Sequence, residues 1–116
     1  MASLTLYHNP RCSKSRQALA LLEAQNIEFQ VHRYLDTPLD VPALEALLQR
    51  LDGGLPQLLR TSEAEWKTLS VSSDDTQGVL AAIAEHPKLM QRPILDRGDR
   101  AIVGRPPEAV LPLLSD

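Results

Sequence analysis

The sequence contains a single cysteine in 116 residues. A lone cysteine cannot close a disulfide within the chain, which excludes a secreted disulfide scaffold and a self-contained dithiol enzyme. Any disulfide that this protein forms must therefore include a sulfur atom from a second molecule. The cysteine and the three histidines also lack the spacing of zinc ligands, so we expect no bound metal and no bound cofactor.

Long apolar runs and an excess of positive charge are also missing. No apolar stretch approaches the ~20 residues of a membrane span, and the N-terminus lacks a signal-peptide pattern, so we expect a cytoplasmic protein. The formal net charge of -3 argues against general nucleic-acid binding, which needs a basic surface. The balance of 43% hydrophobic and 23% charged residues is that of one globular domain over residues 1–116.

The first third of the sequence predicts a strand, a helix and a second strand. Residues 4–8 are rich in β-formers and end at the turn signal Asn9-Pro10. Residues 13–25 contain neither Pro nor Gly and have apolar residues at helical spacing, whereas residues 27–34 alternate between apolar and polar. This order is a βαβ unit with a right-handed crossover.

The middle of the chain reads as helical. Asp40 can cap a helix with a leucine face that Gly53 closes, and residues 55–60 form another short helical piece. The Ser62 to Glu65 segment has the form of a capping box, and Pro87 should stop a further helix. The expected apolar helix positions are Leu44, Leu47, Leu48, Leu51, Val79, Ala82 and Ile83.

The C-terminal part predicts a hairpin and a last helix. Residues 94–96 and 101–104 flank a turn that contains Gly98, and Pro106 and Pro107 begin a helix with Val110, Leu111 and Leu114 on its apolar face. The fold class is therefore α/β, with a four-stranded mixed sheet flanked by helices. A helical insertion lies between the second and third strands.

Cys12 is a candidate nucleophile because it stands at a helix N-terminus, where unpaired N–H groups favour thiolate over thiol. Most lone cysteines are inert small hydrophobes, but the basic setting of this one favours reactivity. The nearby groups with positive or potentially positive charge are His8, Arg11, Lys14 and Arg16. The N–H groups of residues 13–15 also offer a cradle for an oxyanion.

Three further arginines, Arg60, Arg92 and Arg105, stand in turn-like contexts rather than inside helices. The planar guanidinium fork suits tetrahedral oxyanions, although spacing alone does not show that the three converge. His8 either packs at the strand end or tunes the thiol, and its position across a tight turn from Cys12 favours tuning. His32 and His86 lack such neighbours and read as structural or exposed.

The pattern of His8-Asn-Pro-x-Cys12-x-x-Ser15-Arg16, Leu-Leu-Arg60, Arg92-Pro93 and Gly-Arg105-Pro106 resembles the glutaredoxin-linked arsenate reductase family. The resemblance runs over nearly the whole chain in the right order. It implies a thioredoxin-like fold with a helical insertion and an oxidoreductase that serves arsenic detoxification. It also implies a cis peptide before Pro93.

The resemblance assigns roles to particular residues. Cys12 looks like the catalytic thiolate, His8 like its activating group and Ser15 like its hydrogen-bonding neighbour. Arg11 and Arg16 are accessory candidates on the ground of their charge beside the thiol, not of the resemblance. The residues that resemble the oxyanion-binding triad are Arg60, Arg92 and Arg105. By the family's mechanism, Cys12 forms an adduct with arsenate, glutathione supplies the second thiol as co-substrate, and glutaredoxin removes the glutathione as arsenite leaves.

Two other functions remain open at this point. A glutathione-dependent thiol-disulfide reductase would need the same thiolate but not three oxyanion-binding arginines. A thioredoxin-like regulator that binds RNA polymerase would sense oxidation through a Cys-x-x-Cys switch, and Ser15 stands where its second cysteine would be.

Overall fold

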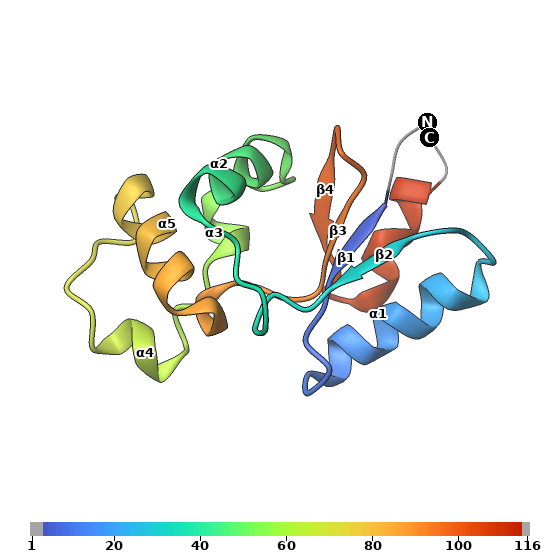
Figure 1. Ribbon diagram of the computed structural model, residues 1–116, viewed down its shortest axis with the longest axis horizontal. Coiled ribbons are helices and arrows are strands. Elements are labelled where there is room, and N and C mark those ends of the chain that lie inside the picture. The colour runs from blue at the N-terminus through green and yellow to red at the C-terminus, as the bar shows by residue number, and fades with distance from the viewer. Residues whose placement is uncertain (1–3, 115–116) are drawn as a thin grey trace.

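The computed structural model describes residues 4–114 and has a four-stranded sheet at its centre, in the order β2-β1-β3-β4 (Figure 1). Strand β1 (Thr5–Tyr7) pairs in parallel with β2 (Gln30–His32) and antiparallel with β3 (Ile94–Asp96). Strand β3 pairs antiparallel with β4 (Ala101–Val103). The predicted mixed sheet and its C-terminal hairpin are confirmed.

The two faces of the sheet bury different partners, because successive side chains of a strand point to opposite faces. One face contributes Leu6 and Leu95 to a cluster with α1 (Ser13–Ala24) and the C-terminal 3-10 helix η2 (Pro107–Leu114). These two helices lie beside each other in Figure 1. The other face contributes Tyr7 and Ile94 to a cluster that extends into the helical insertion.

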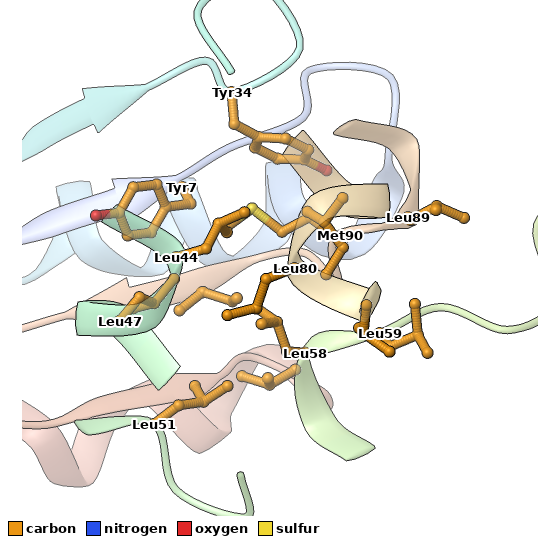
Figure 2. Packing of buried hydrophobic residues seen from close by; sticks show 14 of the residues in the cluster. Tyr7, Tyr34, Leu44, Leu47, Leu51, Leu58, Leu59, Leu80, Leu89 and Met90 are labelled. Atoms are coloured by element: carbon orange, nitrogen blue, oxygen red, sulfur yellow. The ribbon is translucent and has the colours of Figure 1, made fainter. Parts of the chain in front are cut away.

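The insertion lies between β2 and β3, as the sequence predicts. Its elements are α2 (Val41–Arg50), α3 (Leu55–Leu58), α4 (Ala64–Lys67), α5 (Thr76–Glu85) and the 3-10 helix η1 (Pro87–Leu89). Figure 2 shows the leucines of this lobe packed with Met90, Tyr7 and Tyr34, and the hydroxyl oxygens of the two tyrosines point away from each other. The insertion and one face of the sheet therefore share a single hydrophobic core.

Helix ends follow the sequence in two places and depart from it in one. The Asp40 carboxylate caps α2 by accepting a hydrogen bond of 3.0 Å from the Ala43 N–H, and α5 ends at Glu85 before Pro87. The predicted capping box at Ser62 is wrong. Helix α4 begins one residue later, with Glu63 at its N-cap and no side-chain cap. The Glu63 carboxylate faces two arginines, and the Glu65 carboxylate faces Lys88 at 3.7 Å instead of the helix start.

Two further predictions need correction. The C-terminal helix is a 3-10 helix with Pro112 inside it. Val110 and Leu113 are therefore buried, whereas Leu111 and Leu114, which are expected on the apolar face, are only half-buried. The strand expected at residues 27–34 is only three residues long, and its Val31 is 44% exposed. Strand β2 is an edge strand, so one of its sides has no neighbouring strand to cover it.

Candidate active site

Cys12 lies where the chain turns from β1 into α1 and is the N-cap residue of that helix. Its backbone N–H donates to the Asn9 carbonyl at 3.0 Å, and its carbonyl accepts from the Arg16 N–H at 3.0 Å. Asn9 also fixes the turn through its side-chain oxygen, which accepts from the Arg11 N–H at 3.0 Å. The tight turn therefore presents a partly exposed thiol at the start of the helix.

The electrostatic setting of Cys12 favours the thiolate. Partial burial raises the pKa of the thiol, but the backbone N–H groups of Ser15 and Lys14 lower it, as do the charge of Arg105 and a hydrogen bond from Arg92. The balance holds the pKa of Cys12 below its ordinary value. The helix N-terminus and the arginines act in the same direction on this one sulfur.

His8 and Ser15 form a buried pair beneath the thiol. The His8 Nδ1 and the Ser15 Oγ lie 2.7 Å apart, and the Asn9 N–H donates to the same Oγ at 3.0 Å. Burial lowers the pKa of His8, and the charges of Arg33 and Arg16 lower it further. His8 is therefore placed to hold Ser15 and the turn, and the hydrogen bond of Ser15 to the sulfur comes from its backbone N–H.

Arg60 and Arg92 are brought together by a short antiparallel contact outside the main sheet. Leu59 and Met90 form an isolated β-bridge, with the Arg60 N–H donating to the Leu89 carbonyl at 2.8 Å. The segment after α3 and the segment after η1 thus lie side by side. The Arg60 guanidinium group donates a hydrogen bond of 3.1 Å to the Gln91 Oε1.

Arg105 completes the group from the turn after β4. Its Nε donates to the Arg92 carbonyl at 2.9 Å, and its NH2 group lies 3.6 Å from the Cys12 sulfur. Gly104 allows this approach, because a Cβ atom there would lie 2.9 Å from the Pro93 side chain. The Arg92-Pro93 peptide is cis, as the resemblance implies, and the Arg105-Pro106 peptide is cis as well.

The three arginines therefore converge on Cys12. Burial lowers the pKa of Arg60, and the positive charges of Arg92 and Arg105 lower it further, as expected for clustered cations. The Nε atoms of Arg60 and Arg92 are buried and make no hydrogen bond among the described residues. The Arg60 Nε has only a long contact of 3.5 Å with the Glu63 carboxylate. Buried guanidinium donors with such weak protein partners, beside a thiolate, form a site for a tetrahedral oxyanion.

Sequence reasoning missed Glu63, Gln91 and Tyr34 at this site and identified Asn9 only as part of a turn signal. Glu63 approaches Arg60 and Arg92 at 3.5 and 3.9 Å, Gln91 accepts from Arg60, and Asn9 holds the turn. Tyr34 is fully buried beside the site, and its hydroxyl has no hydrogen-bond partner within residues 4–114. The spacing of Glu63 three residues after Arg60 was the one local signal.

The two accessory arginines lie apart from the triad. Arg16 donates to the Pro10 carbonyl at 2.9 Å and so supports the turn. Arg11 is exposed and lines a hollow on the surface beside the turn. Over the described range 4–114 no three His, Cys, Asp or Glu side chains gather as metal ligands, and no helix is long and apolar enough to cross a membrane.

Known proteins are similar to this chain in sequence. The model of the ArsC family matches residues 7–113. An arsenate reductase of Haemophilus influenzae is 40% identical over 97% of this chain and 99% of its own length, and the uncharacterised protein YfgD of Escherichia coli is 42% identical over 94% of both.

Solved structures agree with the sequence relatives. An arsenate reductase from Vibrio cholerae superposes with a TM-score of 0.84 at 44% identity, covering 96% of this chain and 97% of the other. A putative arsenate reductase from Yersinia pestis gives a TM-score of 0.81 at 47% identity, over 95% and 99%. The predicted thioredoxin-like fold with a helical insertion is thereby confirmed, and the chain belongs to the ArsC family.

Proposed function

We propose that this protein reduces arsenate to arsenite with Cys12 as the nucleophile. The observation that supports this most directly is the 3.6 Å contact between the Arg105 NH2 group and the Cys12 sulfur, with Arg60 and Arg92 clustered beside it. A thiolate alone would serve many reactions. Three converging guanidinium groups fit a substrate with several negatively charged oxygens.

The first step joins the enzyme to the substrate. The Cys12 thiolate attacks arsenic, an Sγ–As bond forms, and one oxygen leaves as water with protons supplied by arsenate and solvent. Arsenic keeps its oxidation state of five. The positive charges of Arg60, Arg92 and Arg105 hold the remaining oxygens and stabilise the charge that develops on them.

The second step is the reduction. A glutathione thiolate attacks the Cys12 sulfur, an S–S bond forms and the Sγ–As bond breaks. The bonding pair stays with arsenic, which leaves as arsenite in oxidation state three, while each sulfur loses one electron. Glutaredoxin then takes the glutathione by thiol-disulfide exchange and restores the Cys12 thiolate.

The sequence of this chain supports an external second thiol. Cys12 is its only cysteine, so no internal dithiol can supply the second sulfur. Glutathione and glutaredoxin are available together in the cytoplasm, which is the location that this reaction requires. His8 and Ser15 contribute by holding the turn in the conformation that directs the backbone N–H groups of Lys14 and Ser15 at the sulfur.

The test is arsenite production by the purified protein with arsenate, glutathione and glutaredoxin. We expect Cys12→Ser to lower kcat by at least about a thousandfold, since the nucleophile is lost. Exchange of glutaredoxin for thioredoxin should stop turnover. Arsenite production at the parent rate by Cys12→Ser would disprove the proposal, whereas turnover of mixed disulfides without arsenate reduction would assign the same thiolate to a thiol-disulfide reductase.

A further inference from the structure

A hollow of about 390 Å³ lies on the surface beside the turn that carries Cys12. Its lining comes from the turn itself and from the chain that follows β2, and consists of Asn9, Pro10, Arg11, Arg33, Leu35 and Asp36. None of the three arginines of the oxyanion site belongs to this lining. We propose that the hollow is the binding site for the glutathione that completes the reaction, an inference that rests on the proposed function.

The charges of the lining match those of glutathione. Arg11 and Arg33 are exposed, and neither guanidinium makes an ion pair or a hydrogen bond with any residue from 4 to 114. Asp36 is the one acidic side chain of the lining. Glutathione carries two carboxylates and one ammonium group at neutral pH. The two arginines of the hollow can each pair with one carboxylate, and the aspartate can pair with the ammonium group.

The size and the polarity of the hollow also fit a small peptide. A volume of about 390 Å³ lies in the range of small-molecule sites, which is roughly 300–1,000 Å³. Pro10 and the half-buried Leu35 give the lining an apolar part, and the buried Asn9 offers an amide. An extended anion such as a tripeptide gains more from these groups than a compact arsenate ion does.

The hollow lies next to the reacting sulfur along the chain. Arg11 directly precedes Cys12, and Asn9 accepts the hydrogen bond from the Cys12 N–H at 3.0 Å. Arg33 lines the hollow together with Asn9 and Arg11 of this turn, and its charge helps to lower the pKa of His8. Arsenate and glutathione would thus meet at Cys12 from two separate sets of residues, and holding both beside one atom makes the thiol attack effectively intramolecular.

The first experiment measures binding without any redox chemistry. S-methylglutathione cannot form a disulfide, so its dissociation constant on the full-length Cys12→Ser protein is measured by calorimetry and by amide shifts in NMR spectra. We expect Arg11→Gln and Arg33→Gln each to weaken binding about fivefold, since each removes one solvent-exposed ion pair. Lys67→Gln removes the same charge from an exposed residue of α4 and should leave binding unchanged.

The second experiment measures thiol preference during turnover. The rate with glutathione divided by the rate with 2-mercaptoethanol, which has no carboxylates, should fall about fivefold in Arg11→Gln and in Arg33→Gln. Asp36→Asn should lose the preference for glutathione over its analogue without the amino group. Equal preference in the parent and in all three variants would overturn the inference.

The two experiments separate the inference from the proposed function. If the protein fails to reduce arsenate but S-methylglutathione binds and loses affinity in Arg11→Gln and Arg33→Gln, the site stands and the reaction is a different one. If arsenate is reduced but S-methylglutathione shifts no amide of residues 9–11 or 33–36, the reaction stands and the assignment of the hollow is wrong.

Discussion

Two groups of arginines in this protein carry the same charge but have very different partners. In the first group, Arg50 donates to both carboxylate oxygens of Asp96, at 2.8 and 2.6 Å. Arg100 donates to both carboxylate oxygens of Asp52, with a shortest distance of 2.6 Å. Each of these guanidinium groups has a carboxylate of its own, and the pairs join the insertion to the hairpin of the sheet.

In the second group, Arg60 and Arg92 share one carboxylate. Glu63 lies 3.5 Å from one and 3.9 Å from the other, and the buried Nε atom of each makes no hydrogen bond among the residues described. Arg105 donates to a backbone carbonyl and to the Cys12 sulfur. Three cations with one shared carboxylate leave donors free for an anionic substrate, whereas fully paired arginines stabilise the fold.

The largest effect should follow from breaking a paired arginine. Arg50→Ala leaves the carboxylate of Asp96, a residue only 5% exposed, without its cation, so we expect a loss of about 3–5 kcal/mol in the free energy of unfolding. Urea denaturation followed by circular dichroism measures this. Arg100→Ala breaks a pair with roughly 40% exposed side chains and should cost about 1 kcal/mol or less. Equal losses in the two variants would contradict the distinction.

Removal of one of the two arginines that share Glu63 should lower activity more than stability. Arg60→Ala and Arg92→Ala each remove a charged donor to the substrate, worth about 1.5–3 kcal/mol, so kcat/KM for arsenate should fall roughly 10- to 100-fold. The free energy of unfolding should change by about 1 kcal/mol or less, because the two arginines share the Glu63 carboxylate at the long distances of 3.5 and 3.9 Å and repel each other. Steady-state kinetics and denaturation on the same preparations test both statements. Unchanged kcat/KM would show that these arginines do not bind the oxyanion.

The pH dependence of the thiol tests the third arginine. The pKa of Cys12 is depressed, so thiolate persists to lower pH than for a free cysteine, and the charge of Arg105 is one of the causes. In Arg105→Gln the rate of alkylation by iodoacetamide should rise at a higher pH than in the parent. Arg97→Gln is the control, since its ion pair with Asp99 lies in the hairpin turn. An unshifted profile would mean that the backbone N–H groups and Arg92 lower this pKa without Arg105.

Glu63 should weaken anion binding modestly, because its carboxylate partly neutralises the positive charge of Arg60 and Arg92. Glu63→Gln removes this charge and no helix cap, so arsenate should bind the Cys12→Ser protein about threefold to fivefold more tightly, within the ~1 kcal/mol range of exposed pairs. Glu65→Gln is the matched control, since its carboxylate approaches Lys88 at 3.7 Å instead. Weaker arsenate binding in Glu63→Gln would instead make Glu63 a support for the arginines.

The sequence predicts the features that depend on neighbouring residues, and it does not predict which distant segments meet at the site. Cys12 at a helix start follows from a turn signal and a helical pattern within a few residues. The convergence of the arginines depends on the Leu59 and Met90 bridge and on the approach of Gly104 to Pro93, which join distant segments. Only the family resemblance grouped them. The predicted capping box depends on a distant residue as well, because Glu65, its second member, faces Lys88 at 3.7 Å.

Two buried tyrosines repeat the contrast on a smaller scale. Tyr7 donates to Asp96 at 3.3 Å, whereas the hydroxyl of the fully buried Tyr34 makes no hydrogen bond of standard geometry within residues 4–114, although the Asn9 side chain acts on its pKa. Burial is the first cause that raises the pKa of both to about 12, so both are neutral phenols at physiological pH. An unpaired buried hydroxyl keeps its desolvation cost, while a paired one regains it.

Substitution by phenylalanine should therefore have opposite signs at the two positions. Tyr34→Phe removes the unpaired hydroxyl and should raise the free energy of unfolding by about 1 kcal/mol, whereas Tyr7→Phe removes a donor to a buried carboxylate and should lower it by about 1 kcal/mol. Thermal and urea unfolding of both variants provide the measurement. Destabilisation by Tyr34→Phe would show that this hydroxyl has a partner in solution, and the site would then contain fewer free donors than its geometry indicates.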